Sequence, residues 1–211
     1  MKIAIFGAGG MVGQRIVQEA LRRGHEVTAI VRDPARYSPP DASVKVVKGD
    51  ATDAASIAAT TAGADVVINS ISSNRDGDHQ VWIRAAHALI KGIKQAGVPR
   101  LIVVGGAGSL FVAPGVHLFD TPAFSADWRP AAKVLGESLE VYRTADFDWL
   151  FISPASYIHP GERTGKYRVG GDDLLTDAEG KSEISAEDFA IGLLDEAEKK
   201  GTFKRRITIA Y

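Results

Sequence analysis

The sequence predicts an α/β fold in which a doubly wound parallel sheet is covered by helices on both faces. Short apolar runs alternate with segments of helical periodicity over most of the chain. A glycine-rich segment joins the first apolar run to the first helical segment. The length of 211 residues suits one well-buried core, so we expect a single domain over residues 1–211.

The expected strands are short runs rich in valine and isoleucine, each separated from the next by a helix or a connection. The last of them alternates apolar and polar residues. These runs cover residues 2–6, 25–31, 44–48, 64–70, 100–106, 149–153 and 202–211.

The expected helices follow the strands in turn. Apolar residues of the first form one stripe, and Gly24 provides a stop. Ser185 is expected to cap the last helix, with Asp188 at its third position as part of a capping box. The helices are predicted over residues 11–23, 52–61, 78–96, 127–143 and 186–200.

Residues 155–183 break this rhythm, because they are rich in glycine and polar residues and lack helical periodicity. We interpret them as a small C-terminal substrate region, either a lid or a hairpin. The segment carries three cations that could meet a phosphate such as that of FMN, namely Arg163, Lys166 and Arg168. For any single one of these charges, a solvated hairpin is the favoured alternative.

Composition excludes several classes of function. The 25 basic and 26 acidic residues nearly balance and are scattered, so we expect no nucleic-acid partner. No apolar run approaches the roughly 20 residues of a membrane span, so we predict a cytoplasmic protein. We expect it to be a monomer or a small homo-oligomer. There are no cysteines, and the five histidines lack metal-ligand spacing, so we expect no metal.

Gly7, Gly10 and Gly13 are spaced as G-x-x-G-x-x-G between the first strand and the first helix. An ordinary tight turn would also use glycine here. The position between a strand and an amphipathic helix favours a dinucleotide site, where glycine lets backbone amides approach a diphosphate. The same loop then brings Gly9, Met11 and Val12 to the cofactor.

Arg32 stands at the end of the second strand, where NAD-binding proteins carry an acidic residue for the ribose 2′-hydroxyl. A guanidinium suits the additional phosphate of NADP, and Arg36 adds a second charge. The neighbouring Asp33 leaves a solvated loop arginine as the alternative. We therefore favour NADP and keep NAD as a possibility.

Two further strand ends are expected to contact the cofactor. Asp50 and Ala51 follow the third strand and are placed at the adenine edge, although a turn or helix cap explains Asp50 equally well. Asn69, Ser70 and Ile71 end the fourth strand and are placed beside the nicotinamide ribose, because ligands bind beyond the carboxyl ends of such strands.

The chain resembles the atypical short-chain dehydrogenases of the NADH-flavin reductase type, close to the NmrA-like and biliverdin reductase B types. The resemblance is carried by IAIFGAGGMVGQRIVQEALRRGHEVTAIVRDPAR, GDATD, GADVVI, VVGGAGSL and the segment from Asp148 to Leu175. It implies a Rossmann domain that binds NAD(P)H through the glycine loop and Arg32. It also implies that residues 105–110 form the wall of the nicotinamide pocket, including Gly105 and Gly106.

The sequence departs from the wider superfamily at the catalytic pair. Carbonyl-reducing members use Tyr-x-x-x-Lys, in which the phenol supplies a proton. Here Lys133 takes the lysine position but Arg129 stands where the tyrosine belongs, and Tyr142 has no lysine four residues later. Lys133 is expected to pair with Glu137 on the helix surface.

The missing proton donor favours a reductase whose acceptor needs little acid assistance, such as a flavin (FMN or FAD, as a passing substrate) or a quinone. Ser109 is our first candidate for a catalytic hydroxyl near the acceptor, followed by Ser70 and Tyr157. For Ser109 the alternative is a loop residue that satisfies its own backbone. An NmrA-like NADP sensor without turnover is the alternative function, and a sugar-nucleotide epimerase or dehydratase is disfavoured because it needs the absent tyrosine.

Overall fold

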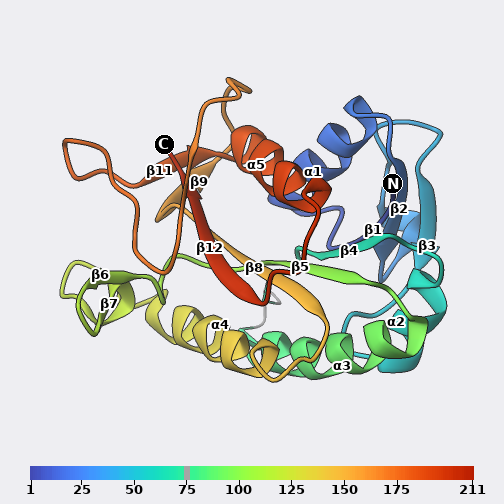
Figure 1. Ribbon diagram of the computed structural model, residues 1–211, viewed down its shortest axis with the longest axis horizontal. Coiled ribbons are helices and arrows are strands. Elements are labelled where there is room, and N and C mark those ends of the chain that lie inside the picture. Colours follow the sequence, from blue (N-terminus) through green and yellow to red (C-terminus); the bar gives the residue numbers. More distant parts are fainter. Residues whose placement is uncertain (74–76) are drawn as a thin grey trace.

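The computed structural model describes residues 1–73 and 77–211, and its centre is a twisted, mostly parallel sheet (Figure 1). In the described chain this sheet has eight strands in the order β10-β12-β8-β5-β4-β1-β2-β3, and only the edge strand β10 is antiparallel to its neighbour. The strands are β1 (Lys2–Phe6), β2 (Glu26–Val31), β3 (Lys45–Lys48), β4 (Val66–Asn69), β5 (Arg100–Val104), β8 (Asp148–Pro154), β10 (Arg168–Gly170) and β12 (Arg205–Ala210).

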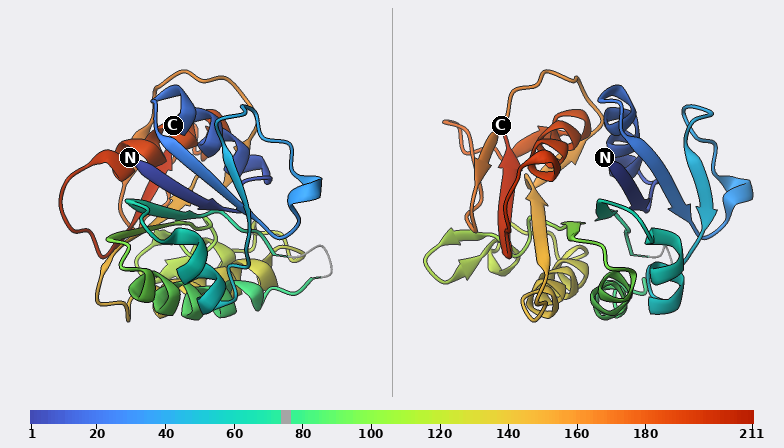
Figure 2. Two further views of the ribbon diagram at one scale, coloured as in Figure 1. Left: turned by 90° about the vertical axis from the view of Figure 1, so that its right-hand side faces the viewer. Right: turned by 45° about the vertical axis from the view of Figure 1, so that its right-hand side comes forward.

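Helices cover both faces of the sheet, as Figures 1 and 2 show. On one face lie α1 (Met11–Arg22) and α5 (Ala186–Glu198), and on the other lie α2 (Ala54–Thr61), α3 (Val81–Ala96) and α4 (Arg129–Tyr142). Side chains alternate along a strand, so β1 contributes to a hydrophobic core on each face of the sheet. Ile3 and Ile5 pack in the core beside α1 and α5, whereas Ala4 and Phe6 pack in the core beside α2, α3 and α4. This is the Rossmann-like α/β fold that the sequence predicts.

Capping contacts mark four helix ends, and they confirm the predicted stop at Gly24 and the predicted cap at Ser185, whereas α2, α3 and α4 begin two or three residues later than predicted. Gly24 follows the last residues of α1 with a φ of 76°, and Gly97 ends α3 in the left-handed conformation. Asp53 caps α2 by accepting a hydrogen bond from the amide of Ala55. Ser185 Oγ accepts from the Asp188 amide at 3.0 Å, which caps α5. Local sequence therefore sets these boundaries.

The strand order reverses at β1, which pairs with β2 on one side and with β4 on the other. Phe6 is level with Ile30 of β2 and with Asn69 of β4 at the carboxyl edge of the sheet. Open α/β sheets bind ligands at such a switch point. The glycine-rich segment leaves β1 at this place and enters α1.

Several short elements were not predicted from the sequence. These are the 3₁₀ helices η1 (Pro34–Arg36) and η2 (Leu118–Asp120), the hairpin β6 (Phe111–Ala113) and β7 (Val116–His117), and the parallel pair β9 (Tyr157–His159) and β11 (Glu183–Ser185). The segment 155–183 thus contributes β9, β10 and the first residue of β11. Strands of two or three residues are too short to show a period, and β9 and β11 pair although they lie far apart in sequence.

Candidate functional site

The glycine loop folds so tightly that two of its glycines cannot carry a side chain. Gly7 has a φ of +76°, and a Cβ atom there would lie 2.5 Å from the carbonyl oxygen of Ser70. A Cβ atom at Gly13 would lie 2.1 Å from the carbonyl oxygen of Gly7. These two glycines let α1 pack against the carboxyl ends of β1 and β4.

The other two glycines face outward. Gly10 is the N-cap of α1 and has no side chain to accept from the helix, while its own amide donates to Gly7 O at 3.0 Å. Gly9 and Met11 are exposed. First-turn amides of a helix have no intrahelical acceptor, so they point toward whatever lies at the helix N-terminus. The outer face of the loop and the first turn through Val12 therefore fit a diphosphate.

Tyr37 is a neighbour of this loop that sequence reasoning missed. Its ring would lie 3.5 Å from a Cβ atom at Gly9. The Tyr37 hydroxyl is buried, has no hydrogen-bond partner in the described ranges, and its burial raises the pKa of the phenol. The only signal available was its position directly after Arg36 in the loop that follows β2.

Arg32 and Arg36 are both exposed in the segment that follows β2 at the carboxyl edge. Asp33 caps η1 by accepting from the Ala35 amide at 3.1 Å. The Asp33 carboxylate, which left the role of Arg32 open in the sequence, therefore forms a local turn. The assignment of both arginines to a 2′-phosphate stays a prediction.

Asp50 adopts the turn arrangement that the sequence left open. Its Oδ1 accepts from the amide of Thr52 at 2.8 Å and from the Thr52 hydroxyl at 2.7 Å, and its own amide donates to Ser56 Oγ. Ala51 is buried. The structure thus gives Asp50 a turn-forming role, and its contact with adenine stays a prediction.

The residues at the end of β4 pack against the start of the glycine loop. Ser70 Oγ donates to the carbonyl of Phe6 at 2.9 Å, and the carbonyl of Ile71 accepts from the Trp82 indole at 3.3 Å. Asn69 is 3% exposed, and its Oδ1 has no partner in the part of the chain that the structure describes. Burial raises the pKa of Tyr142, which a hydrogen bond from Asn69 partly offsets.

Gly105 and Gly106 serve close packing at the end of β5. A Cβ atom at Gly105 would lie 2.0 Å from the Phe151 ring, and one at Gly106 would lie 2.8 Å from the side chain of Leu135. The chain can therefore cross tightly over β8 and α4. Their expected place in the nicotinamide wall is untested.

Ser109 lies in a buried polar cluster. It is 7% exposed, and Arg206 Nη1 donates to its Oγ at 3.0 Å and to its carbonyl at 2.9 Å. His117 Nδ1 donates to the same carbonyl at 2.9 Å. Arg206 also pairs with Asp172 at 2.6 Å. These contacts hold the loop against β12 and favour a packing role for Ser109, so its catalytic role stays a prediction.

The helix that carries the catalytic pair in related enzymes is used differently here. Arg129 Nη2 donates to the carbonyls of Thr121 and Phe124, and so closes the loop before α4. Lys133 Nζ lies 3.8 Å from Asp120 and 5.6 Å above the centre of the Phe119 ring. The expected Lys133–Glu137 pair was wrong, because the preceding loop supplies a carboxylate within reach.

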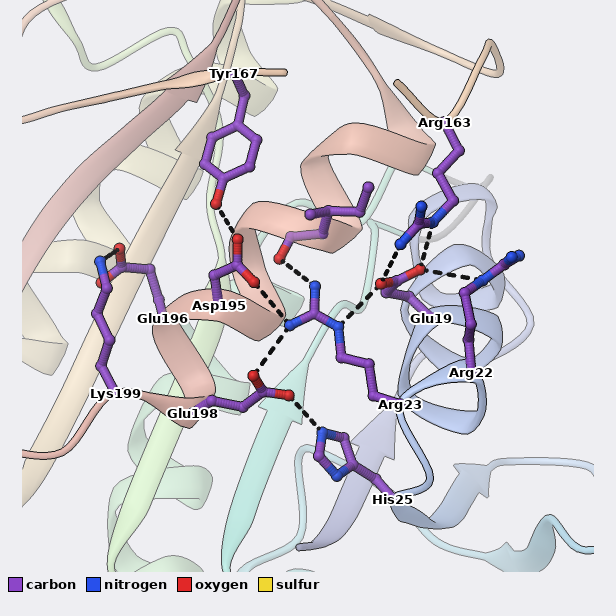
Figure 3. A network of polar contacts seen from close by, with 11 residues as sticks. Glu19, Arg22, Arg23, His25, Arg163, Tyr167, Asp195, Glu196, Glu198 and Lys199 are labelled. Atoms are coloured by element: carbon purple, nitrogen blue, oxygen red, sulfur yellow. Dashed lines mark hydrogen bonds and ion pairs between the residues drawn. The ribbon is translucent and has the colours of Figure 1, made fainter. Parts of the chain in front are cut away.

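Arg163 and Arg168 have partners within the protein, which differs from both the phosphate contact and the solvated hairpin considered for them. Arg163 donates two hydrogen bonds to Glu19 on α1, at 2.8 and 2.9 Å (Figure 3). Arg168 donates to the carbonyls of Thr176 and Tyr211. Both guanidinium groups thus hold this segment to the rest of the fold, which sequence spacing could not show.

Asp188 fastens the same segment to α5. It is fully buried, and its Oδ1 accepts from the amides of Thr164 and Gly165, each at 2.8 Å. Its Oδ2 accepts from the Thr164 hydroxyl at 2.6 Å and from the Tyr211 hydroxyl at 2.9 Å. The carboxylate does not reach back to the Ser185 amide as in a full capping box. It binds a segment more than 20 residues upstream instead.

Glu19 is the acidic centre of the network in Figure 3. It is 4% exposed and accepts from Arg163 and Arg23, and Arg23 also pairs with Asp195 at 2.7 Å. Burial by itself would raise the pKa of the Glu19 carboxyl. The hydrogen bonds from Arg163 and Arg23 outweigh this and hold the pKa below its usual value of 4.5.

The variant Glu19→Gln should lose stability at neutral pH but not in acid. A carboxyl whose pKa is depressed by folding contributes stability above its unfolded pKa, and that contribution is lost as the pH falls through the folded pKa. We expect the difference between wild type and Glu19→Gln in urea denaturation to shrink below pH 4.5. Glu140→Gln, which removes an exposed pair with Arg143, is the control. A difference that is constant with pH would contradict the role given to Glu19.

Two surface pockets lie away from the glycine loop. One of about 440 Å³ lies at the amino ends of β1 and β2, the edge opposite the switch point. The other, of about 560 Å³, lies between the β6–β7 hairpin and residues 173–176. A dinucleotide at the switch point would therefore lie outside both of these pockets.

Residues 1–73 and 77–211 lack two features that would indicate other functions. No group of three His, Cys, Asp or Glu side chains there could hold a metal ion. No helix there has the length and apolar character to span a membrane.

A family model described as NAD(P)H-binding matches residues 7–200. Three solved structures, whose proteins carry provisional names, are similar over the whole chain. The exported protein from Burkholderia pseudomallei is 44% identical, with 100% of both chains covered and a TM-score of 0.90. The epimerase from Bacteroides thetaiotaomicron is 40% identical, with 100% and 96% covered and a TM-score of 0.90. The NADH-flavin reductase from Streptococcus pneumoniae is 34% identical, with 100% and 99% covered and a TM-score of 0.88.

Proposed function

The chain belongs to the NAD(P)H-binding family, and from this premise we propose that it is a reductase that passes hydride from NAD(P)H to a flavin or quinone-like acceptor. The observation that carries the proposal is the glycine loop. Gly7 and Gly13 bring α1 against the sheet edge, and the N-terminus of α1 has no side-chain cap. A similar protein named as an NADH-flavin reductase supports the acceptor class.

The residues of this chain would hold the cofactor in a defined order. The outer face of the loop, from Gly9 to Val12, would receive the diphosphate on backbone amides. Arg32 and Arg36 would receive a 2′-phosphate at the end of β2. When bound, the reduced nicotinamide supplies hydride, that is, one proton and two electrons. The protein then contributes binding and orientation.

The acceptor class follows from what α4 lacks. Arg129 occupies the tyrosine position and is tied to two loop carbonyls, and the phenol of Tyr142 is buried. A carbonyl substrate needs a proton on its oxygen as hydride arrives. A flavin or quinone accepts hydride at a ring atom and takes its second proton from water. The same lack argues against the epimerase chemistry named for the Bacteroides relative.

The direct test follows NADPH oxidation at 340 nm with FMN, FAD or menadione as acceptor. Enzyme-dependent oxidation with at least one of them supports the proposal. Tight NADPH binding without oxidation would instead support a non-catalytic sensor. Binding of neither NADH nor NADPH would overturn both functions.

Arg32→Ala tests the preference for NADP. We expect the Kd for NADP to rise by about 10- to 100-fold, because a guanidinium contact with the 2′-phosphate is lost, and the Kd for NAD to stay within about twofold. Isothermal titration with each dinucleotide measures both. Arg22→Ala, an exposed arginine on α1, is the control. Equal weakening of NAD and NADP would show that Arg32 does not read the phosphate.

A further inference from the structure

We propose that the stacked pair of Tyr157 and His159 is the platform on which a planar aromatic hydride acceptor lies. This inference rests on the proposed function, and it assigns the acceptor contact to a part of the chain that the glycine loop does not touch. Four observations carry it: the place of the pair, its stacking, its rigidity and its exposure.

The place is the carboxyl edge of the sheet. β8 lies beside β5 and ends at Pro154, and β9 begins with Tyr157 three residues later. Three residues of chain span at most about 11 Å, so Tyr157 lies close to this edge. Ile158 and Ile184 pack in the core that contains α1 and α5. β9, which carries the pair, therefore lies on the same face of the sheet as α1, the helix that follows the glycine loop (Figure 1).

The stacking follows from the strand geometry of β9. Side chains alternate along a strand, so Ile158 enters the core while Tyr157 and His159 share the outer face. Their ring centroids are 4.8 Å apart with an interplanar angle of 26°. One face of the Tyr157 ring is thus covered by the imidazole, and the tyrosine is 61% exposed.

The imidazole is fixed by hydrogen bonds on both nitrogens. Nδ1 lies 2.9 Å from the carbonyl of Pro160, and Nε2 lies 2.6 Å from Glu183 Oε1. Both partners are acceptors, so these two contacts favour the doubly protonated form of the ring. The carbonyl of Pro160 is the main cause of the raised pKa of His159, with Glu183 and Glu187 adding to it. The stacked imidazole also limits the movement of the tyrosine ring.

The backbone of the platform is fixed as well. The Tyr157 amide donates to the Ser182 carbonyl at 3.1 Å, and β9 pairs in parallel with β11, which leads directly into α5. An ordered aromatic ring with one covered and one exposed face is preorganised to stack a second ring. Isoalloxazine and naphthoquinone rings have the required shape, and neither needs a proton from the platform.

The experiment measures acceptor binding apart from turnover. FMN fluorescence is titrated with protein that has been saturated with NADP⁺, for wild type, Tyr157→Ala, Tyr157→Phe and His159→Gln. We expect Tyr157→Ala to raise the Kd for FMN by about 10-fold and Tyr157→Phe to retain wild-type affinity, because the ring is what stacks. His159→Gln should fall between them. The Kd for NADP⁺ should be unchanged in all variants.

Trp128→Ala is the matched control, because it removes another exposed aromatic side chain, which no ring stacks upon among the described residues. The platform is overturned if Tyr157→Ala binds FMN as wild type does, if Trp128→Ala weakens binding equally, or if wild type binds none of FMN, FAD and menadione. A failure of the proposed function would look different. In that case the wild-type protein would bind an acceptor but would oxidise no NADPH with any of the acceptors.

Discussion

Replacing Gly13 by alanine is expected to abolish dinucleotide binding and to lower the free energy of unfolding by about 3 kcal/mol. The new Cβ would lie 2.1 Å from the Gly7 carbonyl oxygen and 2.9 Å from Ser70 Oγ. The Gly7 backbone cannot move aside, because it packs on the Ser70 carbonyl. The start of α1 must then shift away from the sheet edge, which moves the amides that would face the diphosphate.

The measurement combines urea denaturation with titration of NADPH fluorescence. Gly171→Ala is the control, because nothing lies within 4 Å of a Cβ atom there and its φ is not positive. We expect Gly171→Ala to leave both quantities almost unchanged. If Gly13→Ala bound NADPH with wild-type affinity, the glycine loop would not be the diphosphate site and the proposed reductase would lose its main support.

Asp188→Asn is expected to have the second largest effect, a loss of about 3 kcal/mol in the free energy of unfolding. The wild-type carboxylate accepts four hydrogen bonds while it is fully buried. An amide group keeps one acceptor oxygen and turns the other position into a donor. The hydroxyls of Thr164 and Tyr211 then lose the carboxylate oxygen to which they donate.

The loss should be local before it is global. Trypsin is expected to cleave after Arg163 and Lys166 faster in Asp188→Asn, because both residues lie beside the amides that Asp188 holds. Asp177→Asn is the control, since Asp177 accepts from the amides of Glu179 and Lys181 in an exposed turn. Equal stability and equal cleavage of the two variants would show that Asp188 does not fasten the 155–183 segment.

The regular elements could be predicted because their signals are local. Strands such as Lys2–Phe6 and helices such as Met11–Arg22 carry their period in consecutive residues. Their ends are written in capping residues, namely Asp53, Gly97 and Ser185. The short strands of the 155–183 segment lack such signals. β9, for example, is defined by its pairing with β11, which lies far away in sequence.

The candidate site divides in the same way. The spacing of the glycines predicted the tight turn at Gly7 and Gly13. The positive φ of Gly7 and the close approach of Gly13 to the Gly7 carbonyl both arise within the loop. The partners of Ser109 and Arg163 could not be read from the chain. Arg206 is 97 residues from Ser109, and Glu19 is 144 residues from Arg163. A long side chain binds a partner that the fold brings close to it. The spacing of residues along the chain does not predict which partner that is.

By itself, the sequence determined the order of the longer strands and helices and the position of the glycine loop, since each depends on the chemistry of neighbouring residues. Only the tertiary structure decided that Arg163 and Arg168 hold the fold rather than a ligand, and that Tyr157 stands exposed on His159. The physical reason is that ion pairs and ring stacking act over a few ångströms in space. Chain packing, rather than sequence separation, sets those distances.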